Sequence, residues 1–142
     1  MKTNSQNHPI LLVEDNPLDL DLTLRAFAQQ KITNPILVAR DGEEALAFIP
    51  KWDAGDPEPV VILLDLKLPK VSGLEVLEIV KNHPKYKTIP VVVLTSSDES
   101  SDVKTAYELG TNSYIVKPVD FEKFIEVAKN IELYWTVLNK PV

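Results

Sequence analysis

The run Val60–Leu64 spells Val-Val-Ile-Leu-Leu and is followed directly by Asp65. An unbroken run of such residues is typical of a strand buried on both faces, as in parallel sheets. In open parallel α/β sheets, ligands bind at the edge formed by the carboxyl ends of the strands. We therefore expect the polar residues after such runs to meet at one edge. Three further runs fit this pattern: Ile10–Val13 before Glu14 and Asp15, Val91–Leu94 before Thr95, and Tyr114–Val116 before Lys117.

Helix signals separate these runs. Asn16 followed by Pro17 is a typical helix start, and Gly110 is a typical helix end. With the short strand Ile36–Ala39, the chain alternates five times between strand and helix, which predicts an α/β fold with a parallel sheet between helices. The remaining expectations are a helix from Asp41 to about Ile49, a loop Pro50–Pro59 with Trp52 as a loop aromatic that covers the core, a helix Gly73–Lys81, a helix with Val103, Ala106 and Tyr107 inward, and a helix from Asp120 to about Leu138.

Length, charge and composition exclude several classes of protein. The 142 residues fit a single domain over 1–142, in which we expect 1–8 to be a flexible tail and 121–138 an extended last helix. The absence of cysteine excludes disulfides, zinc-thiolate sites and thiol catalysis. A net charge of -6 with scattered basic residues argues against nucleic-acid binding. No apolar run approaches the roughly 20 residues of a membrane span, and the first residues lack a signal-peptide core, so we expect a cytoplasmic protein.

The predicted cluster of Glu14, Asp15 and Asp65 indicates a metal site. Three clustered carboxylates repel one another unless a cation or a proton neutralises them, and oxygen ligands suit Mg2+. An alternative for Glu14 and Asp15 is that they only begin a helix, where negative charge is favourable. Asp65 is followed by Leu66 and not by a helix, so this alternative does not account for it.

Lys117 and Thr95 supply what an acidic metal site lacks. An ammonium group can bind an incoming phosphoryl oxygen, and a hydroxyl can hydrogen-bond the same group. An aspartate carboxylate is an established nucleophile towards phosphorus. Because positioning and electrostatics supply most of the catalysis of phosphoryl transfer, the five residues together fit transfer from a good phosphoryl donor onto Asp65.

Four motifs stand in order along the chain: Leu11-Leu12-Val13-Glu14-Asp15-Asn16, Leu63-Leu64-Asp65-Leu66-Lys67-Leu68-Pro69, Val93-Leu94-Thr95-Ser96 and Tyr114-Ile115-Val116-Lys117-Pro118. As a set they resemble the receiver domain of two-component response regulators, and the resemblance extends from Ile10 to about Leu133. It implies a flavodoxin-like fold with five parallel strands in the order 2-1-3-4-5. It also implies a phosphoacceptor signalling protein and not an enzyme in the ordinary sense.

The resemblance assigns roles to the predicted site residues. Asp65 would accept the phosphoryl group from a histidine kinase, and Thr95 and Lys117 would contact that group. The Lys117–Pro118 bond would be cis. The implied ligands of Mg2+ are Glu14, Asp15, Asp65 and the backbone carbonyl of Lys67.

Tyr114 lies three residues before Lys117, where the family has its switch aromatic. Phosphoryl binding would draw Thr95 inward and leave room for Tyr114 to turn in, which is a population shift between two states. The alternative is an ordinary strand aromatic that packs at the sheet edge. Within the family, the chain resembles stand-alone, phytochrome-associated regulators, on the evidence of Asp15-Asn16-Pro17-Leu18-Asp19, the Pro50–Pro59 segment and Glu132-Leu133-Tyr134-Trp135.

The end of the chain carries more apolar residues than one helix face needs, among them Tyr134 and Trp135. Such surface often marks an interface, so we expect a homodimer through the C-terminal part, with fold-back onto the domain as the alternative. Three rival functions remain at this point. An aspartate-nucleophile phosphatase usually has an acid where this chain has Lys67, a flavin site would need a phosphate-cradling loop after the first strand, and a non-phosphorylated binding module would lack site residues that are present here.

Overall fold

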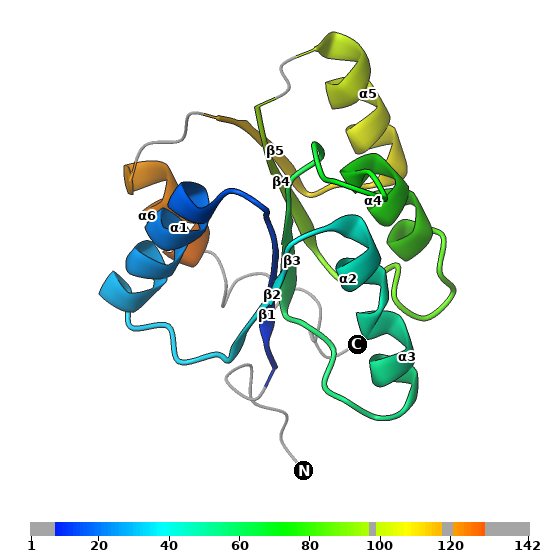
Figure 1. Cartoon of the computed structure of the whole chain (residues 1–142), viewed down its shortest axis with the longest axis horizontal. Helices are drawn as coiled ribbons and strands as arrows, with labels where there is room; N and C mark the ends of the chain where they lie inside the picture. Colours follow the sequence, from blue (N-terminus) through cyan, green and yellow to red (C-terminus); the bar gives the residue numbers. More distant parts are fainter. Residues whose placement is uncertain (1–7, 97–98, 118–120, 130–142) are drawn as a thin grey trace, which may run out of the picture.

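The computed structural model describes residues 8–96, 99–117 and 121–129 and contains a five-stranded parallel sheet. The sheet has the order β2-β1-β3-β4-β5, as predicted (Figure 1). Backbone pairing joins Leu12 to Leu63 in the centre, and Leu63 in turn to Val92. The strands are β1 (Ile10–Val13), β2 (Ile36–Ala39), β3 (Val61–Leu64), β4 (Val91–Thr95) and β5 (Ser113–Val116).

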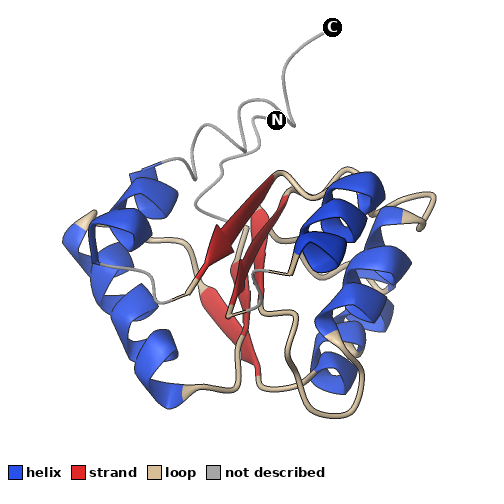
Figure 2. Ribbon diagram, turned by 90° about the horizontal axis from the view of Figure 1, so that it is seen from above, coloured by secondary structure: helices blue, strands red, loops and turns tan. Residues whose placement is uncertain are grey.

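Helices cover both faces of the sheet, and the three layers are seen edge-on in Figure 2. Helices α1 and α6 pack together on one face, and the other four lie on the opposite face (Figure 1). The helices are α1 (Pro17–Gln29), α2 (Gly42–Leu46), α3 (Phe48–Asp53), α4 (Gly73–Lys81), α5 (Ser100–Leu109) and α6 (Phe121–Lys129).

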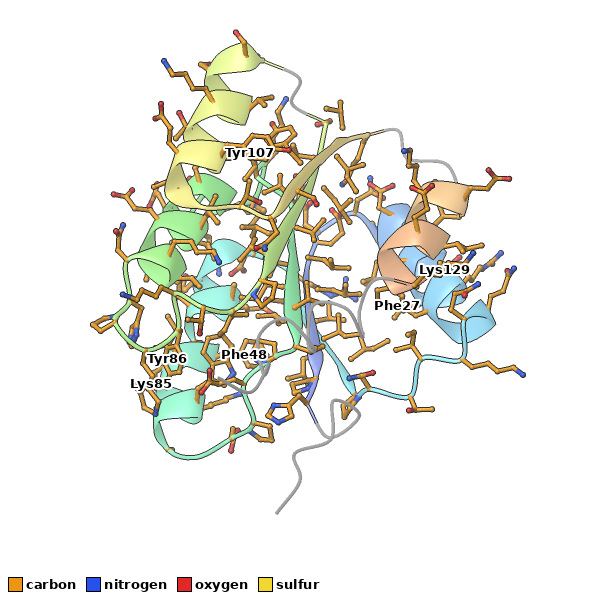
Figure 3. All side chains as sticks on the ribbon, turned by 180° about the vertical axis from the view of Figure 1, so that it is seen from behind. Phe27, Phe48, Lys85, Tyr86, Tyr107 and Lys129 are labelled. Carbon is orange, nitrogen blue, oxygen red and sulfur yellow. The ribbon has the colours of Figure 1, made fainter. Side chains whose placement is uncertain are left out.

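The sheet separates two apolar cores because strand side chains point alternately to its two faces. One core joins Leu11, Val13 and the residues in register with them to α2, α3, α4 and α5. The other joins Ile10 and Leu12 to α1 and α6, where Phe27 is fully buried (Figure 3). The central strands are buried on both faces, as their continuous apolar runs predicted.

The predicted helix signals act as expected where the structure describes them. The Asn16 side chain accepts hydrogen bonds from the backbone N–H groups of Leu18 and Asp19, and Pro17 is the first residue of α1. The Asp41 side chain accepts from the N–H of Glu44 at 2.7 Å. Gly110 ends α5 with a φ of 102°, a conformation that costs glycine little.

Several local predictions were wrong. The helix that begins after Asp41 ends at Leu46, and α3 occupies the start of the predicted loop Pro50–Pro59. Pro50 is the third residue of α3, in the first turn, where its missing N–H needs no intrahelical partner. Trp52 packs on the core as expected, but from a helix and not from a loop: it is 4% exposed, and its ring meets Tyr86 edge-on with the centroids 5.2 Å apart.

A further wrong prediction concerns α5. Ala106 is buried as expected, but Tyr107, which Figure 3 labels on α5, is 50% exposed. His8, expected at the end of the tail, is partly buried, and its ring hydrogen-bonds the carbonyl oxygen of Glu58 at 2.8 Å. The Lys117–Pro118 bond, the Asp120 cap and the segment with Tyr134 and Trp135 involve residues outside those described. Within the described residues, no helix has both the length and the apolar character needed to cross a bilayer.

Candidate functional site

The site lies where the strands end, as the order of the sheet requires. Glu14 follows β1, Asp65 follows β3, Thr95 is the last residue of β4, and Lys117 follows β5. Backbone hydrogen bonds continue the sheet past its edge. The Asp65 N–H donates to Val13 O at 3.0 Å, and the Lys117 N–H donates to Thr95 O at 2.7 Å. These bonds fix the backbone of both residues beside neighbouring strands.

Three carboxylates meet at this edge. Glu14, Asp15 and Asp65 each present one carboxylate oxygen, and these oxygens lie within 4.8 Å of one another. Glu14 and Asp65 are buried, at 8% and 6% exposure, whereas Asp15 is exposed. Burial raises the pKa of Glu14 to about 7, and the charge of Asp65 adds to this effect, although Lys117 opposes it. The donor set is all oxygen and carries excess negative charge, which fits a hard divalent cation such as Mg2+.

Among the described residues, Lys117 places a positive charge next to these carboxylates. Its Nζ lies 2.6 Å from Glu14 Oε1, 2.8 Å from Asp19 Oδ2 and 3.2 Å from Asp65 Oδ2. Burial by itself would lower the pKa of Lys117, but the hydrogen bonds to Asp19 and Glu14 and the nearby negative charges outweigh burial and raise it. The amine is therefore a permanent ammonium group directed at Asp65.

Asp19 is the site residue that the sequence reasoning missed. It belongs to the first turn of α1, whereas the carboxylates predicted for the site directly follow strands. An acidic residue in a first helical turn is already accounted for by the helix dipole, which hides any second role. The available signal was the helix start itself, because Asn16 and Pro17 begin α1 directly after β1 and so keep its first turn at the edge of the sheet.

The loop after β3 folds tightly against Asp65. The Lys67 N–H donates to Asp65 Oδ1 at 3.0 Å, and the Gly73 N–H donates to Leu66 O at 2.9 Å. A Cβ on Gly73 would collide with the carbonyl oxygen of Asp65, and a Cβ on Gly42 would collide with that of Val71. Both glycines therefore allow backbone segments to approach more closely than any side chain would permit.

Thr95 and Tyr114 occupy neighbouring strands. Thr95 is fully buried at the end of β4, next to the backbone of Lys117. Tyr114 is paired in register with Val93 and packs at the margin of the core that contains Leu11. Its ring is tilted towards that of the exposed Tyr107, with the centroids 6.5 Å apart. Tyr114 thus lies between a buried strand and a partly exposed helix face.

Sequence comparisons agree with this geometry. The family described as the response regulator receiver domain matches residues 10–129. FilR2, a probable methanogenesis regulatory protein of Methanothrix harundinacea, is 42% identical over 132 residues, or 92% of this chain and 85% of FilR2. The response regulator Rcp1 of Synechocystis is 40% identical over 128 residues, or 89% of this chain and 87% of Rcp1.

Solved structures share the fold along most of their length. The bacteriophytochrome response regulator RtBRR is 49% identical with a TM-score of 0.77, covering 95% of this chain and 84% of RtBRR. The Mn2+-bound form of Rcp1 is 38% identical with a TM-score of 0.77, covering 95% of this chain and 97% of that one. Phosphorylated RcpA, a cyanobacterial phytochrome response regulator, is 38% identical with a TM-score of 0.78, covering 96% and 97%. With these motifs in this order, on this sheet and around this cluster, the chain belongs to the response regulator receiver domain family.

Proposed function

We propose that this response regulator accepts a phosphoryl group from a histidine kinase onto Asp65, with Mg2+ bound by Glu14, Asp15, Asp65 and the backbone carbonyl of Lys67. The observation that carries the proposal is the contact of Lys117 Nζ with Asp65 Oδ2 at 3.2 Å inside a cluster of carboxylates. A structural ion pair alone would need one carboxylate partner. Here a nucleophile, a cation and an incomplete oxygen coordination site occur together.

The residues divide the chemistry between them. The carboxylate of Asp65 attacks the phosphorus of the donor, the new O–P bond replaces the bond to the leaving group, and no general base is required because a carboxylate nucleophile has no proton to lose. Lys117 stabilises the negative charge on the phosphoryl oxygens. Thr95 ends β4, the strand between those that precede Asp65 and Lys117, and its hydroxyl would hydrogen-bond the same group. A bound Mg2+ would neutralise charge between the carboxylates and the incoming phosphoryl group.

The kinase that we propose as partner is a phytochrome. The support is by similarity, because RtBRR is a bacteriophytochrome response regulator and RcpA is a cyanobacterial phytochrome response regulator. The bound Mn2+ of Rcp1 and the phosphorylation of RcpA support the proposed metal and the proposed modification in the same way. In this proposal the protein is a phosphoacceptor that catalyses only its own phosphotransfer and dephosphorylation.

The proposed output is a change of contacts at Tyr114 and at the C-terminal part of the chain. Phosphoryl binding would draw Thr95 towards the site, and Tyr114 would move into the space left behind. The ring of Tyr114 has the exposed ring of Tyr107 beside it, so this movement would alter the surface between β5 and α5. The C-terminal part would form the homodimer.

Mass spectrometry after incubation with acetyl phosphate and Mg2+ tests the proposal. We expect a mass increase of one phosphoryl group in the wild-type protein and none in Asp65→Asn, whose amide has nearly the same shape but is no nucleophile. A matched control is Asp56→Asn, since Asp56 lies in the exposed segment after α3. Undiminished labelling of Asp65→Asn, at a site mapped elsewhere, would refute the assignment.

A further inference from the structure

The ammonium group of Lys117 has three N–H donors, and three carboxylates receive them. The partners are Glu14, Asp19 and Asp65, at distances of 2.6, 2.8 and 3.2 Å. The side chain of Lys117 is only 11% exposed, so water has little access to replace any of these partners. The position of the ammonium group is therefore set by where the three carboxylates stand.

Two of the three partners have a second task in the proposed function. Glu14 would share its carboxylate with the metal, and Asp65 would both bind the metal and carry the phosphoryl group. Both therefore change their bonding during the reaction. Asp19 has no such task, because it lies outside the carboxylate cluster formed by Glu14, Asp15 and Asp65. Its contact with Lys117 is the one that the reaction leaves intact.

Helix α1 holds Asp19 in a fixed place. Its N–H donates to Asn16 Oδ1 at 3.1 Å, and its carbonyl oxygen accepts from the Thr23 hydroxyl at 2.9 Å. Pro17 further restricts the backbone of this first turn. The Asp19 side chain is 25% exposed, so it is partly buried. A side chain on a rigid element with one short charged contact is well suited to orient another side chain.

We propose that Asp19 is a positioning residue, whose carboxylate keeps the Lys117 ammonium group within reach of the phosphoryl group on Asp65 while Glu14 binds the metal. This inference rests on the proposed function and adds to it a residue from outside the strand ends. It acts through Lys117 and does not touch the reacting atoms.

The charge of Asp19 suggests an opposite role, which is repulsion of the phosphoryl group. Substitutions at Asp19 distinguish positioning from repulsion. A second negative charge near the phosphoryl group would repel it and would offset the charge of Lys117. If repulsion dominated, Asp19→Ala and Asp19→Asn would both strengthen phosphoryl binding, since both remove the charge. If positioning dominates, Asp19→Ala weakens binding, whereas Asp19→Asn retains an acceptor oxygen for Lys117 and rescues most of it.

The test measures binding of the beryllium trifluoride anion, a phosphoryl mimic, at saturating Mg2+, together with the rate of phosphorylation by acetyl phosphate. We expect Asp19→Ala to lower both by about tenfold, in line with the loss of one charge-assisted hydrogen bond. Asp19→Asn should stay within about threefold of wild type on the same reasoning. The matched control is Asp21→Ala, because Asp21 lies on the same helix but is 54% exposed and pairs with Arg25 at 3.0 Å. This control should behave as wild type.

The affinity for Mg2+ alone is measured as well, because it reports the effect of losing a negative charge at this position. Asp19→Ala and Asp19→Asn should change it equally, because they remove the same charge, and only their phosphoryl binding should differ. Equal phosphoryl binding in these two variants, or binding by Asp19→Ala as tight as by Asp21→Ala, would overturn the inference alone. A wild-type protein that binds no beryllium trifluoride and takes no phosphoryl group would overturn the proposed function, and this inference with it.

Discussion

Replacing Lys117 by methionine removes the cation of the site and leaves its carboxylates in place. Methionine has nearly the length of lysine without its charge, so packing along the side chain is largely kept. Glu14, Asp19 and Asp65 would each lose their contact with the ammonium group. We expect the variant to fold in the absence of metal but to be markedly less stable than wild type.

The magnitude follows from the contacts. At about 3 Å and an effective dielectric constant of about 20, each ammonium–carboxylate contact is worth roughly 5 kcal/mol before the cost of desolvation. Removing one partner of a buried pair costs about 3–5 kcal/mol net. We take the lower end, because Lys117 opposes the raised pKa of Glu14, about 7, so loss of the cation raises this pKa further and lets the carboxyl group bind a proton. With a urea dependence of about 2 kcal/mol per molar, a loss of about 3 kcal/mol lowers the unfolding midpoint by about 1.5 M.

Urea unfolding at pH 8, in EDTA and in excess Mg2+, provides the assay. Bound Mg2+ stabilises by about 2.7 kcal/mol at one hundred times its dissociation constant. The stabilisation should be larger in Lys117→Met than in wild type, because the uncompensated carboxylates attract the ion more strongly. The control is Lys104→Met, which removes an exposed lysine that lies 4.0 Å from Glu108. If Lys117→Met loses no more stability in EDTA than Lys104→Met does, the electrostatic account of the site is wrong.

Three further predictions concern the metal, the hydrogen bond between Tyr86 and Asp53, and the end of the chain. Asp15→Asn should bind Mg2+ more weakly than wild type by calorimetry, and equal affinity would place the ion elsewhere. The hydrogen bond from the Tyr86 hydroxyl to Asp53 Oδ1, at 2.6 Å, raises the pKa of Tyr86 to about 12 (Figure 3 labels Tyr86). A folded-state pKa above the ordinary value of about 10 gives a stabilisation that is complete below pH 10 and declines as the pH rises towards 12. The stability advantage of wild type over Tyr86→Phe should therefore shrink between about pH 10 and about pH 12, and a constant difference over this range would contradict the prediction. Replacing Tyr134 and Trp135 by alanine should shift the protein towards monomer in sedimentation at several concentrations, and a wild-type chain that is always monomeric would exclude the dimer.

The sheet was predictable from sequence because its central strands are continuous apolar runs. Burial on both faces leaves no polar alternation to obscure Val61–Leu64 or Val91–Thr95, and a polar residue marks the end of each run. The convergence of Asp65 and Lys117 then follows from parallel topology alone. Helix α3 was not predictable in the same way. Pro50 and Asp53 favour a loop locally, and only the tertiary contact between Trp52 and Tyr86 shows why the segment is helical.

The exposed position of Tyr107 and the contact of Asp19 with Lys117 are likewise tertiary facts. Helical spacing places Ala106 and Tyr107 on adjoining faces, and α5 packs against the core through the buried Ala106 and the partly buried Leu109. The Asp19 contact depends on the angle at which α1 leaves β1. Local sequence patterns specify which residues begin a helix but not where its first turn points.

The close backbone approach at Gly42 and Gly73 limits how this scaffold can be redesigned. An engineer who wished to change partner specificity would vary exposed residues around the site, and the loop that carries Lys67 is an obvious target. Any side chain at either glycine would push that loop away from α2 or from Asp65. Libraries should therefore keep these two positions invariant. Diversity is better placed at residues such as Leu18, which is 71% exposed beside the site and can change shape without moving a backbone segment.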